Sequence, residues 1–390
     1  MACPGRVLGM SNTPKVFHLI CRKGIGGVQT QFETFYRHLD QDQFNNSIIV
    51  EPCGRKGFFG YLVLFGQLLR LVAECRKRST VIHVYNGLVS FRYLLLFLIL
   101  RPVNLIHHER GNAWNLPINR DWLLRLNVSF ARFVLCNSKA TTVLLKKRFQ
   151  IDSSKLVVLY NGVHSTSNSI ALKNVDRIPC DKVFRVGYVG RLEPHKGVHV
   201  LLEAIALCPS KHLHLTVIGD GSQRDFLEKR AMDLSINATF TGMLDHPLEE
   251  MKNFNCVVVP SIREPLGNVV IEAGIIRKAV IASKIDGIPE IIEHEKSGIL
   301  LTPDAEIPYE LTDFKIPIPI AVVNTVSEEL LPPRQLSAAK LSEAILSLKN
   351  NPEICVRLGE NLHASILDKF SIEKYTSQLY DIYRKITHVA

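Results

Sequence analysis

Apolar residues follow two alternating patterns along the chain. Short runs rich in valine and isoleucine alternate with longer segments in which apolar positions recur every three or four residues. The short runs predict buried strands, and the longer segments predict amphipathic helices. In the first part of the chain we expect strands at 16–20, 47–50, 81–84, 103–107, 133–136 and 157–159, and helices at 30–39, 58–75, 88–100, 118–131 and 138–149. This alternation predicts a parallel sheet with helices on both faces.

A polar segment, residues 166–181, interrupts the pattern and is expected to be a linker. A second series then predicts strands at 184–189, 213–218, 238–241, 257–259, 279–282 and 298–301. Its helices are expected at 197–208, 222–234, 247–253, 268–276, 286–293 and 336–349. The sequence therefore predicts an α/β protein with two Rossmann-like domains, 1–165 and 182–369, whose parallel sheets face each other across a cleft.

Composition excludes several other classes of protein. The 390 residues are 46% hydrophobic and 22% charged, which is typical of a folded globular protein. The nine cysteines are scattered without a Cys-x-x-Cys pair, so we expect reduced thiols in a cytoplasm, with neither a disulfide framework nor a zinc site. Residues 1–15 lack the apolar core of a signal peptide. The most apolar run, residues 94–100, is too short to span a bilayer and predicts a buried helix.

Positive charge is concentrated in the first half of the chain. Residues 1–165 contain 22 Lys and Arg against 8 Asp and Glu, whereas the rest contains 25 against 29. A basic half of this kind predicts an anionic partner. The segment from Arg55 to Phe65, followed by the basic residues 76–78, has an apolar middle and basic ends. Two interpretations are open: a helix lying on an anionic membrane surface, or a helix buried against the sheet with solvated ends. No nucleic-acid-binding module is recognisable, so no nucleic acid is expected.

The segment 257–274 carries the first candidate chemistry. The strand Val257–Val259 stops at a Pro/Gly-containing loop, and Asn268 is a plausible cap for the helix that follows. The free N–H groups at such a helix start, together with the helix dipole, favour a phosphate. Glu264 in the loop and Glu272 one turn into the helix are candidates for binding a sugar and a ribose diol. The alternative is a capped helix with two solvated glutamates.

A second candidate is the turn 190–197, which follows the first strand of the second domain. Arg191 and Lys196 flank this loop, and Gly190 and Gly197 bracket it. Two cations there would bind a diphosphate, and they would stabilise the negative charge that develops as it leaves a sugar. The alternative is two surface cations on a loop. The glycine-rich turn 24–29 would approach a phosphate or hydroxyl, but it lacks the Gly-x-Gly-x-x-Gly fingerprint of a nicotinamide site.

The ordered motifs together resemble a known family. They are Gly-Gly-Val (26–28), Asn-Gly-Val (161–163), Gly-Arg-x4-Lys-Gly (190–197), Val-Ile-Gly-Asp-Gly (217–221), Glu-x7-Glu (264–272), Gly-Ile-Pro-Glu (287–290) and Ser-Gly-Ile-Leu (297–300). In this order the chain resembles the retaining glycosyltransferases of family 4, which have two Rossmann-like domains (the GT-B type). The resemblance spans nearly the whole chain and is most specific in the second domain.

The resemblance implies roles for individual residues. Arg191 and Lys196 would bind the nucleotide diphosphate, and Glu272 would hold the ribose. Glu264 would hold the donor sugar and distal phosphate, together with the amides of Leu266, Gly267 and Asn268. The turn at Gly219 and the pair Gly242-Met243 would border the base, and Gly26 and Gly27 would approach the donor phosphate. His108, with His107 as the alternative, would meet the donor sugar; catalysis would thus fall to Arg191, Lys196, Glu264 and His108.

Two features depart from the family pattern. His164 stands where many relatives have an aspartate, at an interdomain hinge. Residues 304–334 form an insertion of about thirty residues, whose apolar content favours packing, either as an added hairpin or as a subunit contact. The C-terminal segment 370–390, with its helix at 375–386, resembles the helix that returns to the first domain.

No metal is predicted. His107 and His108 are adjacent on a strand and point to opposite faces, so they cannot jointly bind one ion. The sequence Asp40-Gln41-Asp42 lies at a helix end, away from the donor motifs, and is interpreted as a solvated cap region. Arg191 and Lys196 would take the place of a metal cation.

The sequence thus predicts a metal-independent hexosyltransferase without a cofactor. It would move a sugar, with retention, from a UDP- or GDP-linked donor to a glycan or glycolipid hydroxyl in surface polysaccharide or lipopolysaccharide biosynthesis. The basic first domain predicts a cytoplasmic protein with peripheral contact at the inner membrane face. Two alternatives remain open: a nucleotide-sugar epimerase of the same fold, and a non-catalytic protein that binds sugar nucleotides or membranes.

Overall fold

The structure, a computed structural model, describes residues 14–21, 35–36, 44–51, 66–67, 69–163, 183–209, 212–308, 311 and 318–387. The chain divides into two compact units. Unit 1 comprises Met1–Glu109, Ile118–Leu135 and Thr376–Ala390, and unit 2 comprises Arg110–Pro117 and Cys136–Tyr375. The predicted linker at 166–181 lies outside the described residues. The predicted domain boundaries therefore stay a prediction.

The first sheet has six strands in the order β2-β1-β3-β4-β5-β6. Their bounds are β1 (Lys15–Cys21), β2 (Asn45–Glu51), β3 (Thr80–Tyr85), β4 (Leu105–Glu109), β5 (Phe133–Cys136) and β6 (Leu156–Val158). Parallel pairing joins β1 to both β2 and β3, and β3 to β4. Each predicted strand is found within two residues of its expected position, because buried runs of branched apolar residues favour a pleated sheet with both faces covered.

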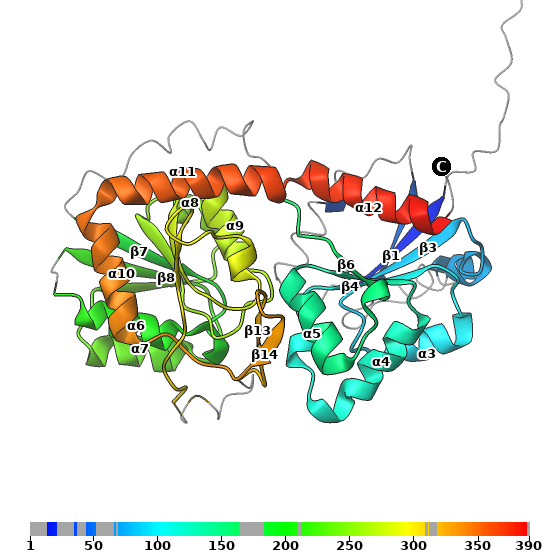
Figure 1. Ribbon diagram of the computed structural model, residues 1–390, viewed down its shortest axis with the longest axis horizontal. Coiled ribbons are helices and arrows are strands. Elements are labelled where there is room, and N and C mark those ends of the chain that lie inside the picture. Colours follow the sequence, from blue (N-terminus) through cyan, green and yellow to red (C-terminus); the bar gives the residue numbers. More distant parts are fainter. Residues whose placement is uncertain are drawn as a thin grey trace, which may run out of the picture. The chain divides into compact units, whose positions relative to one another are not determined.

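Helices cover both faces of this sheet (Figure 1). On one face, the hydroxyl of Tyr383 in α12 (Ile372–Thr387) lies 2.6 Å from Nδ1 of His83 in β3. On the other face, His107 of β4 packs edge-on against Phe97 of α3 (Phe91–Leu100), with ring centroids 5.7 Å apart. The alternation of side chains along a strand explains both contacts. It also confirms that His107 and His108 point to opposite faces.

Helix α3 differs from its prediction as a buried helix. Leu94, Phe97 and Leu100 are buried, but the opposite side of the helix is exposed, and Ile99 is 74% exposed. The neighbouring helix α4 (Asp121–Phe130) likewise exposes Trp122 and Leu126. The prediction was wrong because an apolar run does not show whether a second layer covers its outer face. We call the exposed apolar side chains of these helices and their connections the α3–α4 surface: Phe91, Leu95, Leu98, Ile99, Val103, Ile118, Trp122 and Leu126.

The second sheet also has six parallel strands, in the order β12-β11-β10-β7-β8-β9. Its strands are β7 (Phe184–Val189), β8 (Leu213–Ile218), β9 (Ala238–Gly242), β10 (Cys256–Val259), β11 (Ala279–Ser283) and β12 (Ile299–Leu301). Together with the first sheet it confirms the predicted α/β fold class.

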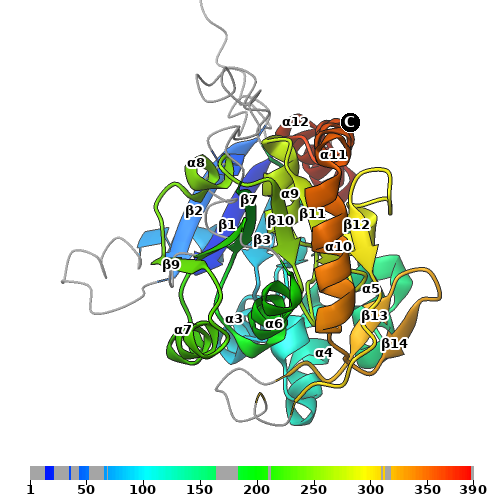
Figure 2. The same ribbon diagram turned by 90° about the vertical axis from the view of Figure 1, so that its left-hand side faces the viewer.

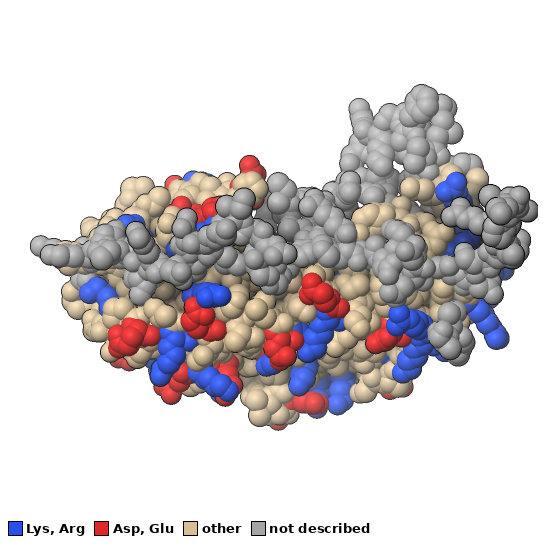
Figure 3. All heavy atoms as spheres, turned by 90° about the horizontal axis from the view of Figure 1, so that it is seen from above, with Lys and Arg blue, Asp and Glu red and all other residues tan. Residues whose placement is uncertain are grey.

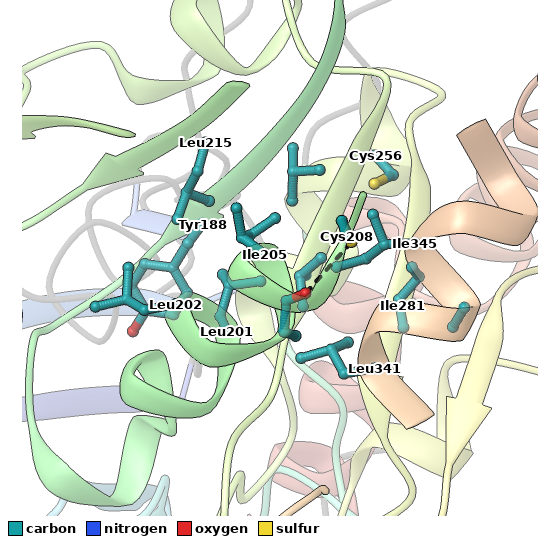
Figure 4. Packing of buried hydrophobic residues seen from close by; sticks show 14 of the residues in the cluster. Tyr188, Leu201, Leu202, Ile205, Cys208, Leu215, Cys256, Ile281, Leu341 and Ile345 are labelled. Carbon is teal, nitrogen blue, oxygen red and sulfur yellow. Dashed lines mark hydrogen bonds between the residues drawn. The ribbon is translucent and has the colours of Figure 1, made fainter. Parts of the chain in front are cut away.

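Two hydrophobic clusters pack against this second sheet. One includes α6 (Val198–Leu207) and α10 (Ala338–Asn350) on one face (Figure 2). Figure 4 shows its centre, where Leu201 and Ile205 of α6 meet Leu341 and Ile345 of α10. The other includes α9 (Asn268–Ile275) and α11 (Pro352–Lys369). Among the described residues, unit 2 also contains the helices α7 (Arg224–Asp233), α8 (Pro247–Met251) and α5 (Lys139–Phe149). The clusters fix the ends of the strands from which the candidate site is built.

Two further segments differ from, or add to, the prediction. The helix expected at 286–293 is only a 3₁₀ turn, Ile288–Glu290, because Gly287 and Pro289 interrupt a longer helix. Within the insertion at 304–334, the described residues form the antiparallel hairpin of β13 (Val322–Asn324) and β14 (Glu329–Leu331), which is one of the two arrangements considered. Among the described residues, no helix combines the length and apolar character needed to span a bilayer.

Candidate active site

The loops after β7 and β10 lie at the point where the order of the second sheet reverses. From β7 the chain passes outward to β8 and β9, and it then returns to place β10 on the other side of β7. In open parallel sheets, ligands bind outside the carboxyl ends of the strands at such a switch point. Both predicted donor loops, 190–197 and 260–267, therefore start at the expected place.

The loop after β7 is held against the turn after β8. Gly190 donates its N–H to the carbonyl of Ile218 (3.0 Å), and Leu192 donates to the carbonyl of Asp220 (2.9 Å). Gly219 has a φ of 135°, and a Cβ atom there would overlap the carbonyl oxygen of Gly190. Gly219 is therefore required for the close approach of two backbones, and its predicted contact with the base stays a prediction.

Lys196 and Glu264 connect the two loops directly. Nζ of Lys196 lies 2.5 Å from Oε2 of Glu264, and their side chains are only 17% and 15% exposed. Ser261 donates a further hydrogen bond to the same carboxylate oxygen (3.2 Å). Gly197, at the end of the first loop, has a φ of 70°, and a Cβ atom there would overlap the carbonyl of Pro260. The loops are therefore in contact through both backbone and side chains.

His195 is buried in the loop that carries Arg191 and Lys196. Burial, followed by the charges of Arg263, Lys196 and Arg191, lowers the pKa of His195 far below its usual range. Of these cations, Arg191 is exposed, Lys196 is partly buried and Arg263 is buried. The backbone carbonyl of His195 also accepts a hydrogen bond from the N–H of Ile262 (2.8 Å). The structure gives Lys196 a direct contact in the site, while the predicted roles of Arg191 and Lys196 toward a diphosphate stay predictions.

Arg263 is a third cation, and the sequence did not reveal it. Its side chain is buried, and Nη1 donates to Oδ1 of Asn115. Burial lowers the pKa of Arg263 to about 10, while the carboxylates of Asp286 and Glu264 raise it. The only signal in the sequence was its place beside Glu264, because the acidic partner Asp286 is distant along the chain.

The loop after β10 ends at the start of α9. Gly267, with a φ of 107°, is the N-cap residue, so the expected cap at Asn268 was one residue late. Asn268 instead accepts a hydrogen bond at Oδ1 from Nδ2 of Asn161 (2.8 Å). Within the described part of the chain, the N–H groups of Leu266 and Gly267 have no acceptor. These two donors, at the positive end of the helix dipole, fit a phosphate oxygen.

Glu272 lies one turn into α9 and is partly buried. Loss of solvent raises the pKa of Glu272 to about 7. Carboxyl groups with a raised pKa are common at binding and catalytic sites, and also occur at buried structural positions. Its role toward a ribose stays a prediction.

The two predicted base-bordering residues follow β9. Gly242 is buried, has a φ of 75° and accepts the N–H of Gly219 at its carbonyl (2.8 Å). Met243, by contrast, is 63% exposed. Gly242 thus connects the end of β9 to the Gly219 turn by a backbone hydrogen bond. The thioether of Met243 is accessible for contact with a flat ligand.

Glu290, the last residue of the Gly-Ile-Pro-Glu motif, caps another helix of unit 2. Its carboxylate accepts the N–H groups of Lys139 (2.8 Å) and Ala140 (2.9 Å), which begin α5, and the hydroxyl of Tyr160 (2.8 Å). Burial raises the pKa of Glu290, and these three donors oppose the shift. The motif is recognisable in the sequence but this role is not, because the capped helix precedes it by 150 residues.

His108 belongs to unit 1 and is buried in the first sheet. Its ring stacks on His83, with centroids 5.4 Å apart and an interplanar angle of 11°. His107 is also buried, which lowers its pKa to about 3. The predicted role of His108 toward a donor sugar stays a prediction.

Several predicted residues lie outside the described part of the chain: Gly26, Gly27, Asp40, Asp42, the segment 55–65 and His164. The described residues contain no group of three or more histidine, cysteine, aspartate or glutamate side chains arranged to hold a metal ion. Metal independence stays a prediction.

Comparisons with known families identify both halves of the chain. Residues 176–308 match the family described as "Glycosyl transferases group 1", and residues 25–166 match "Glycosyltransferase Family 4". Together the two matches cover more than half of the chain.

Among curated proteins, an uncharacterized glycosyltransferase of Methanocaldococcus jannaschii, MJ1607, is 31% identical over 40% of this chain and 43% of its own length. The lipopolysaccharide core biosynthesis glycosyltransferase LpsE of Rhizobium meliloti is 32% identical over 29% of this chain and 33% of its own length. The chain thus spans less than half the length of these relatives. Among solved structures, Anabaena Alr3699/HepE in complex with UDP-glucose superposes with a TM-score of 0.69, covering 95% of this chain and 100% of that chain at 20% identity. This likeness establishes the fold.

Proposed function

The chain belongs to the family 4 glycosyltransferases, and we propose that it transfers a sugar from a nucleotide-sugar donor to a hydroxyl group of an acceptor. The observation that carries this proposal is the contact between the loops after β7 and β10. It places Lys196 against Glu264, with Arg191 in the same loop as Lys196 and the α9 N-terminus at the end of the loop that carries Glu264. Such an arrangement has both the charge and the hydrogen-bond donors that a sugar diphosphate requires.

In the proposed reaction the bond between the anomeric carbon and the diphosphate oxygen breaks. The diphosphate gains negative charge as it departs, so Arg191, Lys196 and the amides of Leu266 and Gly267 stabilise the transition state more than the bound donor. The acceptor oxygen bonds to the anomeric carbon from the same face, and its proton passes to the departing phosphate oxygen. The anomeric configuration is therefore retained, and no metal is required.

We further propose a UDP- or GDP-linked donor and a glycan or lipid-linked glycan acceptor in surface polysaccharide or lipopolysaccharide biosynthesis. Support comes from the UDP-glucose bound by the Anabaena protein and from the lipopolysaccharide assignment of the Rhizobium relative. Glu272 would accept hydrogen bonds from both ribose hydroxyls, which all ribonucleotide donors share.

The α3–α4 surface supports peripheral contact with an anionic membrane. Its exposed leucine, isoleucine and tryptophan side chains are accompanied by Arg92, Arg101, Arg120 and Arg125, all exposed. Apolar side chains that insert below the headgroups and arginines that meet lipid phosphates are the two components of interfacial binding. Figure 3, by contrast, shows a face of the molecule on which basic and acidic side chains are interspersed. We propose that the protein acts in the cytoplasm at the inner membrane face.

A thermal-shift panel of UDP-, GDP-, ADP- and CMP-linked sugars, followed by turnover with lipid-linked acceptors, tests the proposal. We expect one nucleotide to raise the melting temperature and its sugar conjugate to be consumed only with acceptor present. Isomerised donor in the absence of acceptor would instead indicate the epimerase. Binding without any turnover would indicate a non-catalytic sugar-nucleotide-binding protein.

A further inference from the structure

Asp286 connects the inserted hairpin to the loop that carries Glu264. Its side chain is fully buried between the two segments. Oδ2 accepts the backbone N–H of Glu264 (2.8 Å), and Oδ1 accepts the backbone N–H of Val323 in β13 (2.7 Å). The N–H of Asp286 also donates to the carbonyl of Val323 (3.1 Å). Asp286 therefore both accepts a hydrogen bond from Val323 and donates one to it, and it also accepts a hydrogen bond from Glu264.

Gly287, the residue after Asp286, forms a second hydrogen bond with the backbone of Glu264. Gly287 donates its N–H to the carbonyl of Glu264 (3.2 Å), and a Cβ atom on Gly287 would overlap the carbonyl of Pro265. Both backbone polar groups of Glu264 are thus fixed by the 286–287 turn. From this backbone the side chain of Glu264 contacts Lys196 and Ser261.

The geometry specifies an aspartate. Two N–H groups point at two different oxygens, and a carboxylate accepts with both, whereas an asparagine would present an NH₂ group to one of the donors. Burial raises the pKa of Asp286 to about 7, and the N–H donors of Val323 and Glu264, followed by the charge of Arg263, oppose this shift. Asp286 also adopts a left-handed φ of 43°, which aspartate tolerates better than most residues. A position so demanding is consistent with a role beyond filling space.

Among the described residues, the hydrogen bonds between the hairpin and the 286–287 turn are those of Asp286, and Val322 and Val323 are also buried. Both of its strands lie near α5, where an exposed ion pair joins Lys146 to Glu328 at 3.2 Å. Exposed pairs of this kind contribute about 0–1 kcal/mol. Between the hairpin and the body of unit 2, Ile285 and Val322 line a cavity of about 370 Å³, so side chains do not fill that space. Within the described residues, Asp286 is therefore the hydrogen-bonded connection between the hairpin and the donor loop.

We propose that Asp286 is a positioning residue through which the inserted hairpin holds Glu264 in place beside Lys196. The inference rests on the proposed function, because it assigns the hairpin a part in presenting the donor-sugar side of the site. Asp286 does not touch the donor; it acts through the backbone of Glu264.

Two variants remove the connection from opposite ends. Asp286→Asn replaces one acceptor by a donor, and Val323→Pro removes the N–H that Asp286 accepts while keeping the carbonyl that it donates to. Val326→Ala is the matched control, because this residue is 87% exposed at the hairpin turn and does not contact Asp286. For the three variants and the wild type, we would measure the rate of donor turnover, the affinity for the nucleoside diphosphate alone, and the melting temperature.

We expect Asp286→Asn and Val323→Pro each to lower kcat with the nucleotide-sugar by about tenfold or more, since misplacement of a catalytic group by about 1 Å has effects of this size or larger. Affinity for the diphosphate alone should change less than about threefold, because Arg191 and Lys196 are retained. The double variant should lose no more than the stronger single variant, because both break one connection. Val326→Ala should match the wild type.

Equal kcat in the wild type and Asp286→Asn, whatever the change in melting temperature, would overturn the inference and reduce Asp286 to a structural role. Additive losses in the double variant would also overturn it. If Val323→Pro does not fold, the comparison of kcat and diphosphate affinity in Asp286→Asn decides alone. A wild-type protein that turns over no nucleotide-sugar would instead refute the proposed function, which is a distinct outcome.

Discussion

The ammonium group of Lys196 lies 2.5 Å from the carboxylate of Glu264, and the two residues come from loops on adjacent strands of the second sheet. Each charge neutralises the other before a donor binds. An incoming diphosphate would compete for Lys196, and the released carboxylate of Glu264 would then be available to the hydroxyl groups of the sugar. The ion pair thus keeps both side chains near their working positions at a low cost of reorganisation.

Replacement of Arg191 by alanine should lower kcat/KM for the nucleotide-sugar by about 10²- to 10³-fold, the range for loss of one preorganised donor to a developing anion. The reason is that its guanidinium is proposed to contact the leaving diphosphate. Steady-state donor turnover measures the effect. Lys229→Ala is the matched control, because it removes an exposed cation from α7. A catalytic constant in Arg191→Ala equal to that of the control would remove the assignment.

Nucleotide affinity should depend on the ionisation of Glu272, whose pKa burial raises to about 7. Above this pKa the carboxylate accepts both ribose hydroxyls, and below it the protonated group does not. The dissociation constant should therefore fall by about tenfold between pH 6 and pH 8 in the wild type. Glu272→Gln should lose this tenfold dependence and keep only the contributions of other groups, such as the ligand's phosphate and Asp286, whose pKa burial also raises to about 7. Identical pH dependence in the two proteins would rule out ribose binding by Glu272.

Stability should also depend on the same group. Because the folded-state pKa of Glu272 is raised, the folded protein binds the extra proton between about pH 4.5 and 7. The contribution of Glu272 to the free energy of unfolding therefore falls as pH rises through this window, and Glu272→Gln should remove that slope. Urea unfolding at several pH values measures it, and a slope unchanged in the variant would contradict the buried position of the carboxyl group.

Substitution of Gly219 by alanine should reduce the free energy of unfolding by about 3 kcal/mol, because the new Cβ overlaps the carbonyl of Gly190 and φ is 135°. Gly66 provides the contrast. It lies in a helical turn, and among the residues that the structure describes a Cβ atom added there would have no neighbour within 4 Å, so Gly66→Ala should gain up to about 1 kcal/mol. Denaturant midpoints measure both. Equal tolerance at the two positions would mean that the loops after β7 and β8 do not approach as closely as described.

Membrane contact should depend on the α3–α4 surface. The wild type should co-sediment with phosphatidylglycerol vesicles at low salt and not with phosphatidylcholine vesicles. Ile99→Asp should weaken this binding by about tenfold or more, because it replaces an inserted apolar side chain with a like charge to the lipid. Met232→Asp, at an exposed apolar position on α7, is the control and should bind like the wild type. Equal loss in both variants would point to a nonspecific charge effect.

The sequence predicted the strands well, because Val257–Val259 and similar runs are buried on both faces and have no other stable arrangement. It did not predict the exposed side of α3, since Leu95 and Ile99 differ from the buried Leu94 only in what packs over them. It also overextended the helix at 286–293, where the left-handed turn at Asp286 and the ring of Pro289 leave only a 3₁₀ turn.

Within the candidate site, the sequence identified residues carried by local motifs and missed those defined by tertiary contacts. Lys196 and Glu264 each stand in a recognisable loop, and the structure brings them together. Arg263 and Asp286 depend on each other electrostatically across segments that are distant in sequence, so no spacing rule connects them. Asp286 gains its role only because Val323, in the inserted hairpin, folds back onto it.

Titration calorimetry of the nucleoside diphosphate selected by the thermal-shift panel, against the wild type and Lys196→Ala, tests the central claim most directly. If the loops after β7 and β10 bind the diphosphate, the wild type should bind it and Lys196→Ala should bind it about 30-fold more weakly. This change in Kd corresponds to about 2 kcal/mol of binding free energy. Lys229→Ala should bind it like the wild type. Equal affinity in Lys196→Ala and the wild type would contradict the account.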